Sequence, residues 1–165
     1  MTTSEKIKKL EHYILTYQGA HYRLAFSYVK NEQNALDIVQ DAIVKALKSI
    51  DRLQEIDYLH TWFYRILMNT AIDFIRKHKK ITLVEDFPLE PDEPINADLH
   101  LDLFQALETL TIEQKTLIVL RFFEDMKIQD IARVLDENIN TVKARLYTTL
   151  KKLRIELEEY DDELR

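Results

Sequence analysis

The sequence predicts an all-α fold in which two small helical domains are joined by an acidic flexible linker, the second domain ending in a helix-turn-helix. Three observations support this prediction. One glycine and three prolines among 165 residues leave little material for hairpin turns, while helix-forming residues are abundant. All three prolines fall in one acidic stretch. Apolar residues recur at helical spacing on both sides of that stretch.

The composition also excludes several classes of protein. Cysteine is absent, so neither a disulfide framework nor a thiolate metal site is expected. The N-terminus lacks an apolar signal segment, and nowhere do about 18 apolar residues run together, so we expect a cytoplasmic protein. The five histidines show no metal-ligand spacing, and there is no glycine-rich phosphate loop. We therefore expect no enzymatic activity, no metal, no cofactor and no small-molecule substrate.

The first predicted domain, residues 1–80, begins with a helix from Ile7 to Tyr28 that has an irregularity at Gly19. Asn31 is expected to cap the second helix. That helix carries a wide apolar stripe, formed by Ala35, Ile38, Val39, Ala42, Ile43, Ala46, Leu47 and Ile50. The residues left on its outer side include Asp37, Gln40, Asp41 and Lys45. Spacing alone favours contact of these polar residues with solvent.

A third helix is predicted from about Tyr58 to Lys79, after a polar connection over Asp51 to Asp57. It combines aromatic rings with cations, a combination that suits single-stranded or partly melted DNA because bases stack on rings while cations follow phosphates. The candidate DNA-binding residues on it are Trp62, Tyr64, Asn69, Arg76, Lys77 and Lys80. The alternative is that Trp62 and its neighbour Phe63 are core residues.

The predicted linker, residues 81–97, contains Pro88, Pro91 and Pro94 among acidic residues. Between Ile81 and Leu103 there are seven acids and no Lys or Arg. Regularly spaced prolines and like charges favour an extended, mobile segment, so domain boundaries are expected near Lys80 and Ala97.

The second predicted domain, residues 98–165, opens with a leucine-faced helix formed around Leu99, Leu103, Leu107 and Leu110. Thr111 and Gln114 have the spacing of a capping box and predict the start of the next helix. The buried face expected for that helix is Leu117 to Leu120 with Phe122 and Phe123.

The segment from Asp125 to Arg154 has the pattern of a helix-turn-helix. Its first helix has an apolar face formed by Ile128, Ile131, Ala132 and Leu135, and a polar corner follows. The apolar positions of its second helix are Ile139, Val142, Leu146, Leu150, Leu153 and Leu157. The outward side chains suited to base edges and phosphates are Thr141, Lys143, Ala144, Tyr147, Thr148 and Lys151. The alternative is an ordinary helical hairpin with solvated cations.

Charge is segregated along the chain, whose net charge is −6. Five cations and one acid lie between His60 and Lys80, and five cations and no acid lie between Asn138 and Ile155. These two basic segments fit nucleic acid, whereas the acidic segments between and after them disfavour non-specific DNA binding and favour a protein partner.

Seven short motifs, in this order, resemble bacterial extracytoplasmic-function sigma factors, group 4 of the sigma-70 family. They are Asp37-Ile-Val-Gln40-Asp41, Trp62-Phe-Tyr-Arg-Ile, Asn69-Thr-Ala-Ile-Asp73, Leu110-Thr-Ile-Glu-Gln-Lys, Leu120-Arg-Phe-Phe-Glu-Asp, Asp130-Ile-Ala and Thr141-Val-Lys-Ala-Arg-Leu. Each motif is weak by itself, but their order and spacing across nearly the whole chain are specific.

The resemblance implies the partners and the role of each candidate site. Core RNA polymerase would be bound through its β′ clamp helices and its β flap, with the clamp helices meeting Asp37, Gln40 and Asp41. Residues 1–80 would correspond to sigma region 2 and bind the minus-10 element of promoter DNA, with Asn69 helping to read it. Residues 98–165 would correspond to region 4 and bind the minus-35 element, through Arg121, Thr141, Lys143, Ala144, Tyr147 and Thr148. The family also implies an anti-sigma factor, often membrane-anchored.

Two departures from the family pattern affect the expected details. Asp136 stands at the helix-turn-helix corner where glycine is usual, and Asp tolerates the left-handed backbone conformation better than most residues. Ala144 cannot donate a hydrogen bond, and Thr148 replaces a frequent cation, so base readout should differ in detail. A stand-alone helix-turn-helix regulator and a helical protein-binding adaptor remain as alternatives. The first leaves the aromatic, cationic helix without a role, and the second leaves the basic segment after Asn138 unexplained.

Overall fold

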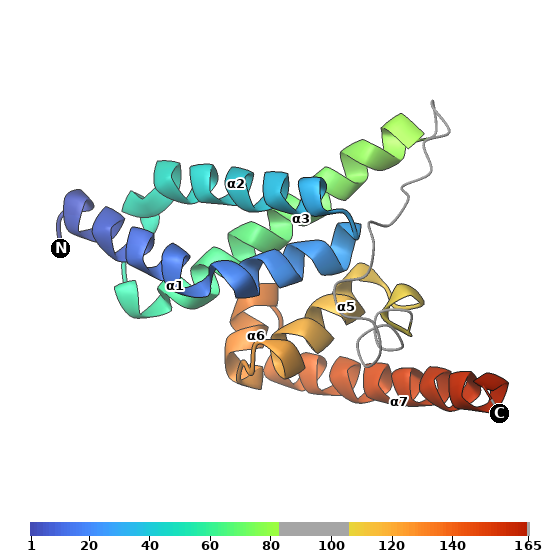
Figure 1. Ribbon diagram of the computed structural model, residues 1–165. Helices are drawn as coiled ribbons and strands as arrows, with labels where there is room; N and C mark the ends of the chain where they lie inside the picture. The colour runs from blue at the N-terminus through green and yellow to red at the C-terminus, as the bar shows by residue number, and fades with distance from the viewer. Residues whose placement is uncertain (83–105, 165) are drawn as a thin grey trace. The chain divides into compact units, whose positions relative to one another are not determined.

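The computed structural model describes the backbone of residues 1–82 and 106–164, and the side chains of residues 1–78 and 106–154. Within these ranges every regular element is helical (Figure 1). No helix among the described residues is long and apolar enough to cross a membrane. The chain divides into two compact units, Met1–Glu90 and Pro91–Arg165. Almost all of the predicted linker, residues 83–97, lies outside the described residues.

The first unit consists of helices α1 (Thr3–Val29), α2 (Glu32–Ser49) and α3 (Leu59–Thr82), which pack against one another in pairs (Figure 1). The 3₁₀ turns Ile50–Arg52 and Ile56–Tyr58 connect α2 to α3. The prediction that Asn31 caps α2 is confirmed, because its side chain accepts a hydrogen bond from the Asn34 backbone N–H at 2.8 Å.

Two sequence predictions for this unit are wrong in detail. The irregularity in α1 falls at Tyr17, where φ is −109° and ψ is 15°, and not at Gly19. Leu47 was expected in the buried stripe of α2 but is 40% exposed, whereas Ala35, Ile38, Ala42 and Ala46 are fully buried. The buried stripe of α2 is therefore narrower than predicted, and three of its four residues are alanines.

The second unit contains α5 (Ile112–Ile118), a π-helical turn (Val119–Phe123), α6 (Ile128–Leu135) and α7 (Ile139–Leu164). The predicted capping box is confirmed: the Gln114 backbone N–H donates to Thr111 Oγ1 at 3.2 Å, and the Thr111 N–H donates to Gln114 Oε1 at 3.1 Å. Leu107 and Leu110 are buried as expected, while Leu99 and Leu103 lie outside the described residues.

The buried face predicted for Leu117 to Phe123 is only partly correct. Leu117 to Leu120 are buried, but Phe122 is 56% exposed. The π-helical turn explains the difference, because the Glu124 N–H donates to the Val119 carbonyl five residues earlier. Phe122 lies within this wider turn, where the angular spacing of the residues differs from that of an α-helix, and its side chain is therefore not on the buried side.

The helix-turn-helix prediction is confirmed in its essentials. Asp136 ends α6 in the left-handed conformation, with φ 54° and ψ 48°, as expected for a residue in the place of glycine. Over residues 139–154, where its side chains are described, the buried residues of α7 are Val142, Leu146, Thr149 and Leu153. The predicted core positions Ile139 and Leu150 are instead 41% and 37% exposed. Thr149 was missed because a polar residue was not expected in the core, but its hydroxyl donates to the Arg145 carbonyl at 2.6 Å.

Candidate nucleic-acid and protein interfaces

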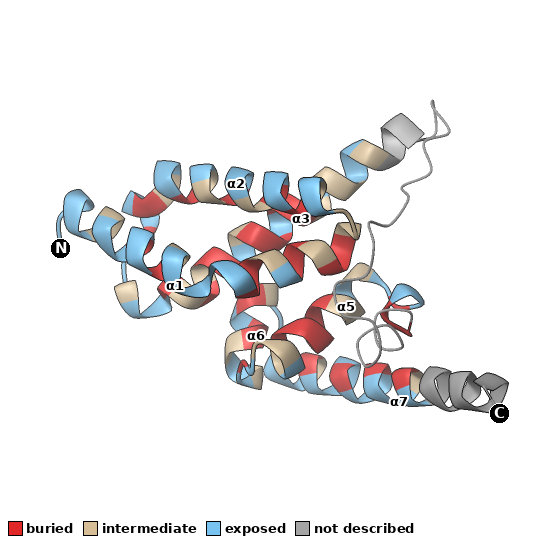
Figure 2. Cartoon of the chain, viewed as in Figure 1, coloured by how far each residue is buried: buried red, intermediate tan, exposed pale blue. Residues whose placement is uncertain are grey.

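The outward side of α7 carries the residues predicted to contact duplex DNA. Lys143, Ala144, Tyr147 and Thr148 are all exposed, and Tyr147 is the most exposed of the large apolar residues that the structure describes, at 73%. The buried and exposed sides of α7 separate clearly along the helix (Figure 2). Thr141, also predicted to face DNA, is half-buried at the start of this surface.

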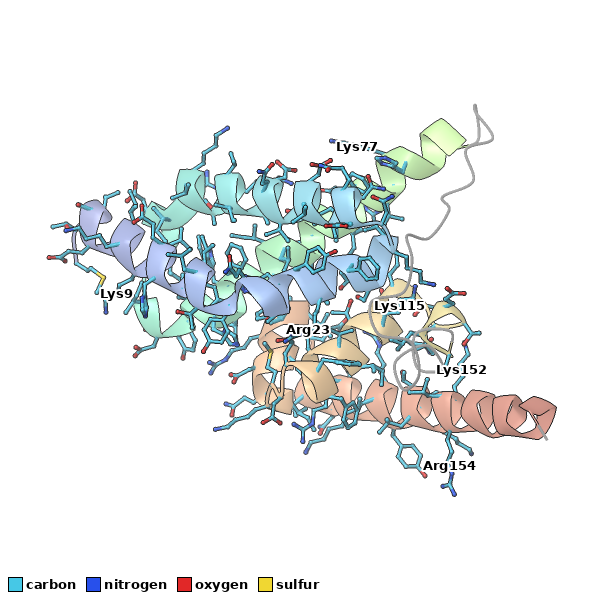
Figure 3. The ribbon with its side chains drawn as sticks, in the orientation of Figure 1. Lys9, Arg23, Lys77, Lys115, Lys152 and Arg154 are labelled. Atoms are coloured by element: carbon cyan, nitrogen blue, oxygen red, sulfur yellow. The ribbon has the colours of Figure 1, made fainter. Side chains whose placement is uncertain are left out.

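Hydrogen bonds at the beginning and the middle of α7 fix its position. Asn138 Oδ1 accepts from the Asn140 N–H at 2.8 Å and so caps the helix. Lys152 Nζ donates to the Thr109 carbonyl at 3.0 Å, so this cation is used inside the second unit. Lys152 and Arg154 leave α7 on different sides (Figure 3), and Lys151 and Arg154 are both exposed.

Two arginines near this surface take part in contacts that the sequence did not predict. Arg121, a predicted minus-35 residue, is half-buried and donates from Nη1 to the Met126 carbonyl at 3.1 Å. It therefore helps to hold the loop that leads into α6. Arg145 Nη1 lies 3.1 Å from Glu137 Oε1, so the helix-turn-helix corner pairs with α7, the second or recognition helix of the motif. An eight-residue separation across a turn gives no regular sequence signal for such a pair.

Helix α3 presents three of the six predicted single-strand-binding residues on its exposed side. Asn69, Arg76 and Lys77 are exposed, and Lys77 projects away from the helix in Figure 3. Trp62 is half-buried, so part of its indole ring is accessible, and Phe63 is fully buried. The side chain of Lys80 lies outside the described residues.

The prediction that Tyr64 presents its ring to DNA is wrong for this structure. Its exposure is 0%, and its ring packs edge-on against the imidazoles of His21 and His60, with centroid distances of 5.1 and 5.0 Å. The physical reason is helical spacing, because Tyr64 shares the buried side of α3 with Leu67 and Ala71.

Tyr64 belongs to a buried aromatic cluster with a hydrogen-bonded centre. The Tyr13 hydroxyl lies 3.0 Å from His21 Nε2 and 3.0 Å from His60 Nδ1. His21 Nδ1 is buried without a hydrogen-bond partner. Burial and, second, the neighbouring His60 lower the pKa of His21 to about 3. The cluster is structural, since it connects α1 with α3 through the core of the first unit.

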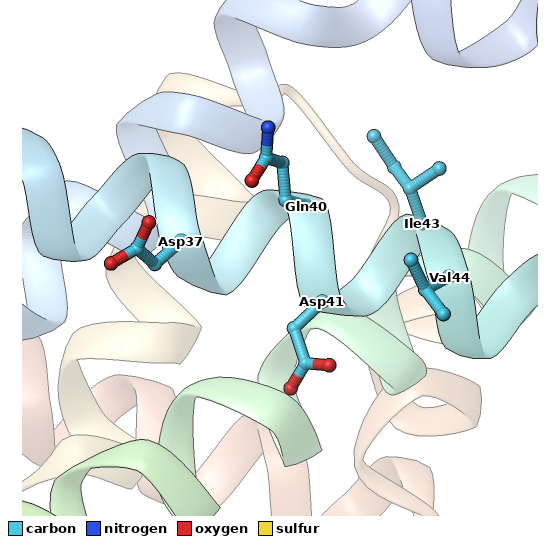
Figure 4. A pocket seen from close by; sticks show the side chains of 5 residues that line it. All are labelled: Asp37, Gln40, Asp41, Ile43 and Val44. Atoms are coloured by element: carbon cyan, nitrogen blue, oxygen red, sulfur yellow. The ribbon is translucent and has the colours of Figure 1, made fainter.

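The outer side of α2 forms a candidate protein interface. Asp37, Gln40 and Asp41 are exposed, and with Ile43 and Val44 they line an open surface pocket (Figure 4). Gln33 Nε2 donates to Asp37 Oδ1 at 3.0 Å, and Lys45 Nζ lies 3.5 Å from Asp41 Oδ2. These contacts are exposed and weak, so both carboxylates remain available to a partner.

Apolar residues on this side of α2 were not among the predicted site residues. Leu36 is 44% exposed and Val44 is 46% exposed. They lie four residues before and after Gln40, so all three fall on one side of the helix. Apolar residues mixed with carboxylates are typical of a protein interface. The four-residue spacing off the core stripe was the sequence signal that could have found them.

Comparisons with known proteins place both units in one family. Residues 13–81 match the family described as sigma-70 region 2, and residues 100–153 match the family described as sigma-70 region 4. RNA polymerase sigma factor SigV of Bacillus subtilis is 49% identical over 146 residues, which cover 85% of this chain and 86% of that protein. The extracytoplasmic-function sigma factor SigW of the same organism is 28% identical over 158 residues, covering 86% of this chain and 84% of SigW.

Two solved structures share the fold. The sigma factor RpoE from Bartonella quintana, in complex with the anti-sigma factor NepR, has a TM-score of 0.78 and 24% identity, covering 92% of this chain and 98% of RpoE. CnrH in complex with the cytosolic domain of CnrY has a TM-score of 0.69 and 22% identity, covering 91% of this chain and 88% of CnrH.

Two helical units, the second containing a helix-turn-helix, correspond to the two sigma-70 regions that the chain matches. The chain belongs to the sigma-70 family of RNA polymerase sigma factors, in its extracytoplasmic-function group. It is an alternative sigma factor that directs transcription initiation, with core RNA polymerase and promoter DNA as its partners.

Proposed function

We propose that the two units divide promoter recognition between them, with residues 98–165 binding the minus-35 element and residues 1–80 recognising and melting the minus-10 element. The observation that carries this proposal is the exposed set Lys143, Ala144, Tyr147 and Thr148 on one side of a capped recognition helix. A helix of this kind fits the major groove, where base pairs are distinguishable.

The exposed part of α3 supports the minus-10 role of the first unit. Asn69 offers an amide to a base, while Arg76 and Lys77 offer cations to phosphates. The accessible part of Trp62 gives a ring on which an unstacked base can lie. Tyr64 has no part in this proposal. The chemistry of initiation is assigned to the polymerase, and this chain acts by binding alone.

The outer side of α2 is proposed as the contact with the β′ clamp helices of core polymerase, and the second unit as the contact with the β flap. Exposed carboxylates bordered by Leu36 and Val44 suit a basic and apolar partner surface. An anti-sigma factor, in the cytoplasm or at the inner face of the membrane, is the proposed inhibitor. The two solved structures of the same fold support this, because RpoE is bound there to the anti-sigma factor NepR and CnrH to the cytosolic domain of CnrY.

Transcription in vitro tests the proposal directly. Core polymerase with this chain, offered a library of promoters, should initiate at a defined subset and should not do so when the chain is left out. Sequencing of the transcripts should reveal two sequence elements upstream of the start sites. Initiation that is independent of promoter sequence would exclude the proposal.

The α2 surface can be tested by a matched pair of triple variants. Alanine at Asp37, Gln40 and Asp41 should weaken core polymerase binding at least tenfold, because the interface loses two charges and an amide. Glu11, Gln18 and Asp57 are also exposed, and alanine at these three positions likewise removes two carboxylates and one amide. This control variant should bind core polymerase as tightly as the parent. Both variants should keep the helical circular dichroism of the parent. Equal polymerase binding by the two variants would contradict the assigned surface.

A further inference from the structure

The centre of the recognition helix presents carbon atoms more than hydrogen-bond donors. The buried side of α7 is centred between Val142 and Leu146. At 3.6 residues per turn, Ala144 lies nearly opposite that buried side, and Tyr147 and Thr148 lie on either side of Ala144. Ala144 is thus the middle of the surface that would enter a groove, and its side chain is a single methyl group.

The hydroxyl of Thr148 is already engaged within the helix. Thr148 Oγ1 donates to the Ala144 carbonyl at 3.0 Å, and this bond uses its only hydrogen. Thr148 therefore keeps a methyl group and an acceptor oxygen for a base. Arg145, on the other flank, is paired with Glu137 at 3.1 Å. Lys143 is exposed at the border of this surface and supplies a donor there.

The chemical group that matches such a surface in the major groove is the 5-methyl group of thymine. It is the only apolar group that a standard base pair displays there, and alanine methyl, threonine methyl and aromatic carbons are the side-chain groups that contact it. We propose that Ala144, Tyr147 and Thr148 form an apolar strip that reads thymine methyl groups in the minus-35 element, and that Lys143 contacts a guanine at the border of the strip. The inference rests on the proposed function, because it requires α7 to lie in that groove.

Deoxyuridine substitution tests this reading, because deoxyuridine differs from thymidine only by the missing methyl group. A minus-35 sequence is first selected with the holoenzyme from a randomised library. Each thymine is then replaced in turn, and holoenzyme binding to the promoter duplex is measured. We expect a loss of about fourfold in affinity for each contacted methyl group, and little change at the other thymines.

Two variants at one position separate the methyl group from the hydroxyl group. Thr148→Val keeps the methyl and should retain the preference for thymine over uracil. Thr148→Ser keeps the hydroxyl and should lose that preference at one position.

A variant at a second position tests the border of the strip. Lys143→Ala should lower the holoenzyme's affinity for promoters with the contacted guanine, without changing the ratio of affinities for thymine and uracil at the other positions. Circular dichroism of each variant checks that α7 still forms.

The outcomes of these experiments distinguish thymine recognition by α7 from the proposed function, promoter-specific initiation, on which it rests. Promoter-specific initiation that tolerates uracil at every minus-35 thymine would overturn thymine reading and leave the proposed function standing. A Thr148→Ser holoenzyme with an unchanged preference for thymine at every position would overturn the part assigned to Thr148. Absence of promoter-specific initiation by the parent holoenzyme would overturn both.

Discussion

The two histidines around Tyr13 constrain where hydrogens lie in the core of the first unit. His21 Nδ1 has no partner whichever nitrogen carries the hydrogen, but a buried N–H without an acceptor is rarer in folded proteins than an acceptor without a donor. We therefore infer that Nε2 carries the hydrogen and donates to the Tyr13 oxygen, 3.0 Å away. The Tyr13 hydroxyl hydrogen is then available to His60 Nδ1, also at 3.0 Å. Protonation of His21 would place a charge and a second donor in this buried site.

The first prediction is a loss of stability in acid that originates at His21. Its pKa is lowered to about 3 in the folded protein, so between this value and the unfolded pKa of 6.5 the unfolded state binds more protons. The contribution of neutral His21 to the free energy of unfolding is therefore complete above pH 6.5. Below pH 6.5 it falls by about 1.4 kcal/mol per pH unit. Urea unfolding of the first unit from pH 7.5 to 4.5 measures this slope. His21→Phe should flatten it, whereas exposed His12→Gln should leave it as in the parent.

The second prediction separates base reading from phosphate attachment on α7. Lys143→Ala should cost about 1 to 3 kcal/mol at the preferred minus-35 site and relax base preference there. Lys151→Ala should weaken binding to all sequences alike and lower the salt slope by about one unit. Both lysines are exposed, so folding should be unaffected. A randomised minus-35 library read by the holoenzyme measures both effects, and a changed preference in the Lys151 variant would show that the assigned side of α7 is rotated.

At the scale of elements, the pairing of Glu137 with Arg145 connects the corner of the helix-turn-helix to its recognition helix. The two side chains are 36% and 42% exposed, so the pair adds little to stability. Its larger effect is electrostatic, because Glu137 holds a negative charge against a cation that could otherwise approach a phosphate. We therefore expect Glu137 at the corner to reduce the affinity of α7 for any DNA sequence.

The third prediction follows from this pairing. Glu137→Ala should strengthen holoenzyme binding to all minus-35 sequences and raise the salt slope by up to about one unit, since Arg145 becomes free for a phosphate. The sequence preference and the unfolding midpoint should change little. Titration of promoter affinity against salt measures the slope. In the background of Arg145→Ala, the same Glu137 substitution should change neither the promoter affinity nor the salt slope. If both still increased, the effect would belong to Glu137 alone and not to its pairing with Arg145.

At the scale of the whole molecule, a net charge of −6 opposes unaided binding to DNA. The fourth prediction is that the free chain binds a minus-35 duplex no more tightly than on the order of 10⁻⁶ M at physiological salt. The holoenzyme should bind the same sequence in a promoter with clear specificity. Fluorescence anisotropy with a labelled duplex makes both measurements. Tight, sequence-specific binding by the free chain would instead favour a stand-alone helix-turn-helix regulator.

The helical fold and the helix-turn-helix were predictable because their signals are local. Capping residues such as Asn31 and Thr111 mark helix starts in the sequence itself, and Asp136 at the corner was interpretable from its tolerance of positive φ. The errors arose where burial depends on partners distant in sequence. Thr149 is buried by neighbouring helices, and Phe122 is exposed by a π-helical turn that no spacing rule anticipates, whereas the burial of Tyr64 could have been predicted from its helical spacing to Leu67 and Ala71. Contacts across a turn, such as Glu137 with Arg145, likewise required the structure.

The first turns of α1 lie before residue 13, where the match to sigma-70 region 2 begins, yet they belong to the packed unit. Leu10 is 0% exposed, Lys6 Nζ donates to the Leu53 carbonyl at 2.8 Å, and Thr3 Oγ1 donates to Asp51 Oδ1 at 2.6 Å. The boundary of sequence similarity is therefore not the boundary of folding. A fragment cut at residue 13 for expression or crystallisation would lose a core side chain and two contacts to the segment that connects α2 to α3. An isolated first unit should begin upstream of Thr3, and a tag placed there should end before the capping residue Thr2.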